Sequence, residues 1–392
     1  MIATDWPGFR GANRDGRVLE TRIATDWTAS SLTELWRIPV GPGWSSFAAV
    51  GNRLVTQEQR GESEVVVCYD LENGGLIWRH VDASRFSEIV SGAGPRSTPT
   101  YANGRIYTLG GRALLNCLDA ATGQPIWQRD LMSEIDAKLP TWGFSSSPLV
   151  VDDRVILYAN GADDHGVVAY DAATGARNWH VATRGTNYSS AQPCMFGGRT
   201  LVLLAGSRQL NAIDPVDGTV QWEYSHEGER SMAIVQPQQI DETSVIVPFG
   251  DSGGLARLSV ELMDGAWEID EVWTSRDMKP SFNDFVHHEG YLYGFDQNLF
   301  CCLDAETGER CWKRGRYGFG QVILFAEQGL LLVASEQGEL VLLEADPDSY
   351  SELASLEAIG GKTWNHPVVV RNRLVIRNGS EAVCYALPVD TT

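Results

Sequence analysis

Short runs of alternating apolar and polar residues recur along the whole chain, and glycine-containing turns separate them. In "LLNCLDAATGQPIW" (residues 114–127), Leu115 and Cys117 alternate with polar neighbours, which is the period of a half-buried strand. Asp119 then opens a turn, and Gly123 supplies the positive φ that a tight hairpin requires. The pattern predicts an all-β protein built from strand–turn–strand units.

The same unit returns at several places. The stretch "CLDAATGQPIW" (117–127) reappears as "CLDAETGERCW" (302–312) and "AYDAATGARNW" (169–179), and more loosely at 68–78 and 212–222. The tryptophan that ends each unit is large enough to fill a gap between neighbouring sheets. These marker tryptophans are Trp36, Trp78, Trp127, Trp179, Trp222, Trp273 and Trp312, and a weaker eighth site lies near Leu353.

The markers stand 39 to 52 residues apart. A unit of this length with four short strands is a propeller blade. The last segment (364–387) supplies three strands, and "ELWRIPV" (34–40) supplies a single strand without preceding partners, so pairing them closes a ring. We therefore predict an eight-bladed β-propeller of four-stranded antiparallel blades. Seven blades is the alternative, if residues 230–276 do not make a full blade.

The propeller is expected to form one domain over residues 33–388, with residues 1–32 as an extension packed on it. No apolar run reaches membrane-spanning length, and the start "MIATDWPGFRG" lacks the pattern of a signal peptide. We expect a monomeric protein that does not span a membrane.

Charge and cysteine content narrow the partners. A formal charge of −20 disfavours nucleic acid and anionic membranes, and suits a polypeptide or a small neutral or cationic ligand. The seven cysteines follow no metal-ligand spacing. In the adjacent pair Cys301–Cys302, the second residue fills a repeat position, which favours core packing over a functional disulfide.

The motif Ala/Cys-x-Asp-x-x-Thr-Gly-x-x-x-Trp resembles the tryptophan-docking repeat of pyrroloquinoline quinone (PQQ)-type propellers. That group includes quinoprotein alcohol dehydrogenases and the lipoprotein scaffold of the outer-membrane β-barrel assembly machinery. The opening "DWPGFRGANRDG" and the closing "TWNHPVVVRNRLVIRNGSEAVCYAL" are similar to the ends of PQQ-like repeat proteins of planctomycete-type bacteria. The resemblance implies a propeller outside the cytoplasm, in the periplasm, and leaves function open, because one fold hosts enzymes, sensors and scaffolds.

A candidate site follows from where the innermost strands begin. The first strand of each blade lines the channel, so residues just before these strands converge on one mouth. Their aromatic rings offer stacking faces and their polar groups offer hydrogen bonds, although the same residues also suit packing between blades. The expected site residues are Trp44, Ser46, Arg96, Trp142, Ser146, Tyr188, Ser190, Phe282, Asn283, Asp284, Trp364, Asn365 and His366.

Three functions remain open. We favour a non-enzymatic binding or scaffold protein that acts through the channel mouth or blade edges and needs no cofactor or metal. The resemblance also implies a PQQ- and Ca²⁺-dependent alcohol or sugar dehydrogenase, in which Asn283 and Asp284 would hold the metal and Asp284 would be the catalytic base. No further acidic residue joins them at the other strand starts, which speaks against a hard-cation site. The aromatic rim leaves a third possibility, a carbohydrate-binding or sensor propeller.

Overall fold

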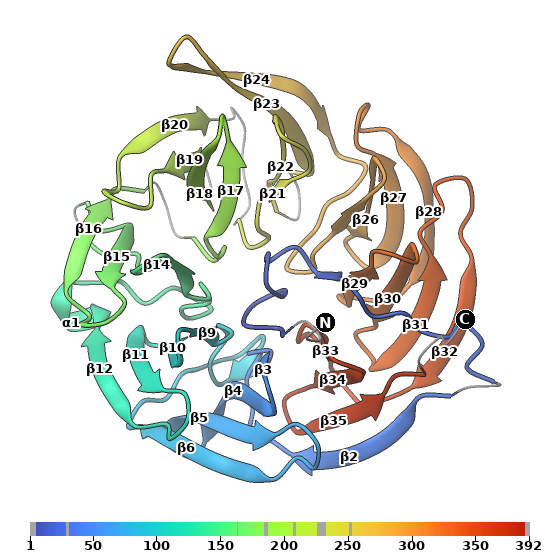
Figure 1. The fold of residues 1–392 in the computed structure, drawn as a ribbon, viewed down its shortest axis with the longest axis horizontal. Helices are drawn as coiled ribbons and strands as arrows, with labels where there is room; N and C mark the ends of the chain where they lie inside the picture. The colour runs from blue at the N-terminus through green and yellow to red at the C-terminus, as the bar shows by residue number, and fades with distance from the viewer. Residues whose placement is uncertain are drawn as a thin grey trace.

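The computed structural model describes residues 5–28, 31–162, 164–183, 187–206, 209–225, 233–250 and 253–388. Eight small antiparallel sheets stand in a ring, as Figure 1 shows, and this confirms the predicted eight-bladed propeller. The region 230–276 contributes the strands of a complete blade, so the seven-blade alternative is wrong. Within the described ranges, no helix has both the length and the apolar content to cross a membrane.

Each blade places its four strands in chain order from the ring centre outward (Figure 1). The short helix α1 (Leu131–Glu134) follows the second blade. The first four blades consist of β3 (Ala48–Val50), β4 (Arg53–Arg60), β5 (Ser63–Asp70) and β6 (Leu76–Asp82); β9 (Thr100–Ala102), β10 (Arg105–Leu109), β11 (Leu114–Asp119) and β12 (Pro125–Asp130); β13 (Leu149–Val151), β14 (Arg154–Tyr158), β15 (Val167–Asp171) and β16 (Arg177–Val181); and β17 (Gln192–Phe196), β18 (Arg199–Ala205), β19 (Gln209–Ile213) and β20 (Val220–Ser225).

The second half of the ring repeats this arrangement, except that the eighth blade takes its outer strand from the start of the chain. Its blades consist of β21 (Gln238–Gln239), β22 (Ser244–Pro248), β23 (Leu255–Met263) and β24 (Ala266–Ser275); β25 (Val286–His288), β26 (Tyr291–Asp296), β27 (Leu299–Asp304) and β28 (Arg310–Arg316); β29 (Gln321–Phe325), β30 (Leu330–Ala334), β31 (Glu339–Glu344) and β32 (Glu352–Glu357); and β33 (Val368–Val370), β34 (Arg373–Arg377), β35 (Glu381–Ala386) and β2 (Thr33–Pro39).

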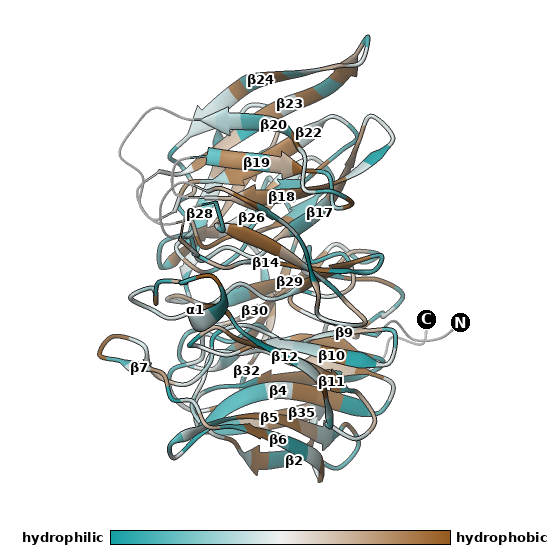
Figure 2. Cartoon of the chain, turned by 90° about the vertical axis from the view of Figure 1, so that its left-hand side faces the viewer, coloured by the Kyte–Doolittle hydropathy of each residue, from teal (hydrophilic) through white to brown (hydrophobic). Residues whose placement is uncertain are grey.

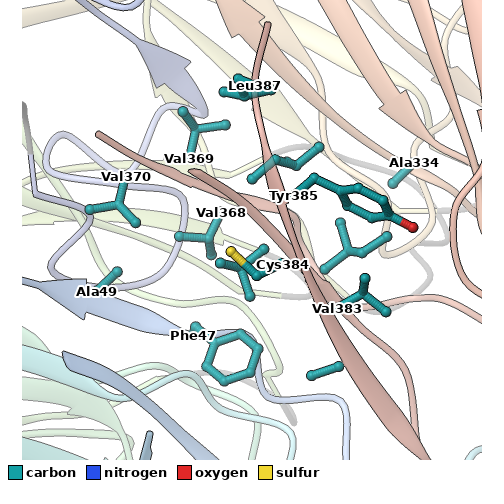
Figure 3. Close-up of a cluster of buried hydrophobic side chains, with 14 of the residues drawn as sticks. Phe47, Ala49, Ala334, Val368, Val369, Val370, Val383, Cys384, Tyr385 and Leu387 are labelled. Atoms are coloured by element: carbon teal, nitrogen blue, oxygen red, sulfur yellow. The ribbon is translucent and has the colours of Figure 1, made fainter. Parts of the chain in front are cut away.

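The two chain ends close the ring as the sequence predicted. Strand β2 pairs antiparallel with β35, in a register that runs from Thr33 opposite Ala386 to Pro39 opposite Glu381. Figure 3 shows the apolar cluster at this closure, where Val368 and Val383 of the last blade lie near Phe47 of the first. The pairing removes two sheet edges that would otherwise be open to association.

Six marker tryptophans join one blade to the next through an indole hydrogen bond, whereas the Trp222 indole N–H has no partner among the described residues. The Trp127 indole N–H donates to the carbonyl of Ala172 in the following blade at 3.1 Å. Its ring covers Gly175, where φ is +69° and a Cβ atom would lie 2.6 Å from the ring. The repeated Asp, Gly and Trp are thus one interblade joint. The same indole bond joins Trp36 to Leu71, Trp78 to Ala120, Trp179 to Pro215, Trp273 to Ala305 and Trp312 to Asp346.

The N-terminal segment, residues 5–18, winds across the middle of the ring (blue in Figure 1) and touches blades on several sides. Trp6 forms a β-bridge with Ala49, and β1 (Arg17–Val18) pairs in parallel with β29. The Arg14 guanidinium donates to the carbonyl of Ser147 at 2.9 Å. Arg10 and Arg14 have φ values of 60° and 57°, a conformation that residues other than glycine rarely adopt and that surrounding contacts must hold in place.

A small hairpin of β7 (Ser87–Glu88) and β8 (Gly92–Ala93) stands out from one face of the disc (Figure 2). Its tip carries Ile89 and Val90, both exposed. We call residues 86–94 the rim hairpin.

Candidate functional site

A cavity of about 550 Å³ opens at the ring centre, and residues from all eight blades line it together with Phe9 of the N-terminal segment. Lining positions alternate along each blade's approach to its innermost strand, as side chains do in extended chain. The outer ring comprises Trp44, Arg96, Ser145, Tyr188, Ile234, Phe282, Phe319 and Trp364, and the inner ring, two residues further on, comprises Ser46, Thr98, Ser147, Ser190, Asp284, Gln321 and His366.

Ten of the thirteen expected site residues line this cavity, and three do not. The amide of Asn283 donates to the Gln297 carbonyl, and that of Asn365 to the Ser45 carbonyl. The hydroxyl of Ser146 accepts the Tyr158 backbone N–H. The predictions for Ser146, Asn283 and Asn365 are therefore corrected: each stands between two lining residues, so the alternation turns its side chain into the blade.

The same alternation identifies lining residues that the sequence reasoning missed. His366, Asp284 and Ser190 of the inner ring each stand two residues after an aromatic residue of the outer ring, and the same step of two in the second and third blades adds Thr98 and Ser147. Lys362 falls in this pattern as well. Phe9 carried no such signal, because a distant segment brings it to the channel.

The aromatic side chains of the outer ring form a continuous wall. The Trp44 and Trp364 rings lie 4.7 Å apart between centroids, and Phe282 contacts Trp364 edge-on at 4.9 Å. Phe319 stacks on Phe282 at 5.1 Å. The Trp364 indole N–H donates to Glu336 at 2.9 Å, which fixes the orientation of that ring. The wall presents large apolar faces to a ligand. Because its rings are already held in place, ligand binding costs little side-chain entropy.

The inner ring is held together by hydrogen bonds from one blade to the next. The Ser46 N–H donates to the Thr98 hydroxyl at 3.0 Å, the Thr98 N–H to the Ser147 hydroxyl at 2.9 Å, and the Ser147 N–H to the Ser190 hydroxyl at 2.9 Å. Gln321 continues the ring with bonds to the carbonyls of Phe282 and Trp364. These side chains therefore have a structural role and also face the cavity.

Asp284 and His366 meet Arg10 at the floor of the cavity, where all three are buried. Arg10 Nη1 lies 3.3 Å from Asp284 Oδ1, and His366 Nε2 lies 2.7 Å from Asp284 Oδ2. Burial alone raises the pKa of Asp284, but the Arg10 charge and the His366 bond outweigh it and hold the pKa below its usual value. Burial lowers the pKa of His366, although Asp284 acts in the opposite direction. The group is thus a charged Arg–Asp pair beside a neutral histidine.

This arrangement predicts an acid-sensitive contribution to stability. Because the folded-state pKa of His366 is lowered, the unfolded chain binds more protons below about pH 6.5, and stability falls as pH decreases. The pKa of the Asp284 carboxyl lies below its ordinary value because of Arg10 and His366, so this carboxyl stays charged in the same window. Between pH 6.5 and 5.5, wild type should lose up to about 1 kcal/mol more than His366→Gln in urea denaturation. Parallel pH profiles of the two proteins would show that the pKa of His366 is not lowered in the folded state.

Arg96 lies at the mouth, and the protein holds it through several hydrogen bonds. Its guanidinium donates to the Trp142 carbonyl at 3.1 Å, the Gly92 carbonyl at 2.8 Å, Glu88 at 3.2 Å, and also to the Gly94 carbonyl. Burial lowers the pKa of Arg96 to about 10 in spite of Glu88. Arg96 therefore clamps the rim hairpin against the cavity wall, and most of its five N–H donors are already bonded to the protein.

Comparison with known proteins bears on this site. The family described as "Outer membrane protein assembly factor BamB", which consists of PQQ-like repeats, matches residues 62–314. The chain belongs to this family. The BamB protein of Moranella endobia (strain PCIT) is 20% identical over 289 residues, which is 71% of each chain.

Two solved structures share the fold. BamB from Moraxella catarrhalis superposes with a TM-score of 0.64 at 17% identity, over 92% of this chain and 99% of that one. A europium-containing methanol dehydrogenase superposes with a TM-score of 0.72 at 13% identity, over 98% of both chains. At these identities the likeness concerns the fold alone. The similarity of the chain ends to planctomycete-type proteins stays a prediction.

The dehydrogenase likeness raises the question whether the cavity suits PQQ and Ca²⁺, and its residues do not. Calcium takes about six to eight oxygen ligands, usually with several carboxylates. Asp284 is the single carboxylate among the lining residues, and Arg10 already neutralises it. The described residues contain no cluster of three or more acidic, histidine or cysteine side chains placed to hold a metal. Among the described lining residues, the carboxylates of PQQ would find Lys362 and one remaining N–H of Arg96 as cationic donors.

The cysteines lie away from the cavity. Cys301 and Cys302 are both free thiols and both fully buried in β27. Burial raises the pKa of each thiol, which makes them unreactive packing residues.

Proposed function

We propose that this protein is a non-enzymatic binding scaffold of the cell envelope, which holds its ligand at the aromatic mouth of the propeller channel. The observation that carries the proposal is the Arg10–Asp284 ion pair at the cavity floor. Arg10 of the N-terminal segment takes the place next to Asp284 that a metal cation would need in a catalytic site. Aromatic rings, among them Trp44, Phe282 and Trp364, line the space above this pair. What remains is a preformed cavity suited to binding.

Catalysis is disfavoured by the same ion pair. A general base needs a pKa near the operating pH, whereas Arg10 and His366 hold the pKa of Asp284 below its ordinary value. Membership of a family described as an outer membrane protein assembly factor supports a place in the periplasm and a role in protein assembly.

The rim hairpin offers a surface for a protein partner. Ile89 at its tip is fully exposed, and Val90 beside it lines the cavity. Exposed apolar residues are typical of protein contact surfaces. Because Arg96 already holds the hairpin in place, a partner that binds there does not have to order a flexible loop. The outer blade strands are a second route, by addition of an extended strand.

The first experiment tests the absence of quinoprotein chemistry. Adding PQQ and Ca²⁺ to the purified protein should leave the melting temperature unchanged, and no dye-linked alcohol oxidation should appear. A rise in melting temperature that needs both ligands, together with oxidation, would overturn the proposal.

The second experiment tests binding at the mouth. Pull-down from envelope extract should retain the same proteins with wild type and with the control Met195→Ser/Val216→Ser, in which two exposed apolar residues away from the mouth and from the outer strands are changed. The variant Ile89→Ser/Val90→Ser should lose them, because it removes the apolar tip of the rim hairpin. Identical retention by all three proteins would place the contact elsewhere and contradict the proposal.

A further inference from the structure

The inner ring of the cavity carries three hydroxyl groups whose hydrogens are not donated to any acceptor among the described residues. Thr98, Ser147 and Ser190 come from three consecutive blades, and each accepts a backbone N–H of the ring. Among the described residues, none of the three donates its own hydrogen to a protein acceptor. All three are at least nine-tenths buried and line the cavity. Since buried donors are normally paired, this row of hydroxyls is suited to acceptor oxygens on a ligand.

The charges at the cavity disfavour charged ligands. A cation would find Asp284 already paired with Arg10, and the Lys362 ammonium, 4.2 Å above the Trp364 ring, would repel it. An anion would find Lys362 and one remaining N–H of Arg96 as donors, but the net charge of −20 opposes its approach. The cavity therefore favours a neutral molecule, which narrows the earlier expectation of a neutral or cationic ligand.

The shape restricts the ligand further. Phe9 and Arg10 of the N-terminal segment close the floor, so a long chain cannot thread through. About 550 Å³ lies within the range of small-molecule sites. On one side stand the rings of Trp364 and Phe282, in edge-to-face contact, and in the inner ring stand the hydroxyl donors.

We infer that the cavity binds a neutral saccharide, with the C–H face of a sugar ring on the aromatic wall and its oxygens on the hydroxyls of Thr98, Ser147 and Ser190. A sugar ring combines one apolar face with acceptor oxygens at its edge, which matches these two surfaces. This inference rests on the proposed function, because it names the ligand chemistry of the same mouth.

Calorimetric titration of the full chain tests it. The probes are glucose, N-acetylglucosamine and cellobiose, with glucosamine and glucuronate as analogues of glucose that differ in charge. At least one neutral probe should bind at millimolar concentration, and both charged analogues should bind about tenfold more weakly than glucose if glucose binds. Absence of binding by every neutral probe, or preference for a charged analogue, would overturn the inference.

A matched pair of variants locates the site. Ser147→Ala removes a donor that faces the cavity, whereas Ser146→Ala removes a neighbouring hydroxyl that faces the blade. Each loses one acceptor for a backbone N–H, so their melting temperatures should be similar. Ser147→Ala should weaken the bound saccharide about tenfold, and Ser146→Ala less than about twofold. Equal effects of the two variants would contradict the assigned position.

The outcomes separate this inference from the proposed function. If no saccharide binds while envelope proteins are still retained through Ile89 and Val90, the saccharide inference is wrong and the scaffold proposal stands. If PQQ with Ca²⁺ binds and supports oxidation, the scaffold proposal is wrong whatever the saccharide titration shows.

Discussion

Replacing Trp127 by alanine is expected to lower the free energy of unfolding by about 3 to 5 kcal/mol, the usual cost of removing a large buried aromatic ring. The ring packs on Gly175 of the next blade and its N–H bonds to Ala172, so the change opens a cavity at an interblade joint. Urea denaturation followed by circular dichroism measures the loss.

Two comparisons make this result specific. Trp127→Phe keeps most of the ring but loses the bond to Ala172, and should cost less than Trp127→Ala. Trp364→Ala should also cost far less, because Trp364 is half-buried and faces the cavity. Equal losses in Trp127→Ala and Trp364→Ala would show that Trp364 packs as a core residue and is not a wall of the site.

Replacing Arg10 by methionine is expected to cost about 3 to 5 kcal/mol, because it leaves the Asp284 carboxylate buried without its counter-charge. The same change removes the bond from Arg10 to the Phe285 carbonyl and so detaches the N-terminal segment from the sixth blade. Hydrogen exchange of the described residues 5–18 should become faster, and denaturation should shift to lower urea.

A double-mutant cycle separates the ion pair from the packing of the segment. Asp284→Asn removes the carboxylate charge, so Arg10→Met should cost less in that background than in wild type. Strict additivity of the two changes would mean that the pair contributes no coupling, and the charge argument for a non-catalytic floor would then be wrong.

The interblade joints show how much of the fold lies in local sequence. Each joint sets the tryptophan of one repeat on the turn glycine of the next, as Trp127 lies on Gly175. The motif that supplies both partners recurs visibly in the sequence, with its aspartate, glycine and tryptophan at 119, 123 and 127 and in the other repeats. Because a blade contacts mainly its neighbours, a local repeat is enough to predict the blade, and the unpaired strand at 34–40 is enough to predict the closure.

The site was predicted less completely, for a geometric reason. Aromatic and hydroxyl residues before the innermost strands were identified from the sequence, but Ser146, Asn283 and Asn365 were included although they point away from the cavity. Side chains alternate along an extended chain. If a residue facing the channel is misplaced by one position, the residue named instead has its side chain inside the blade. Period-two counting within each blade would have removed these errors.

Local pattern thus decided the number of blades, the joints between them and the approximate place of the mouth, because all of these depend on neighbours in the chain. The character of the cavity was decided by contacts across the ring. Arg10 meets Asp284 and His366 from segments hundreds of residues apart, and nothing in the spacing of the "GFRGANRDG" stretch indicates that its arginines insert into the channel. That long-range contact makes Asp284 half of a buried ion pair instead of a free carboxylate. It is therefore the contact on which our proposal of binding over catalysis depends.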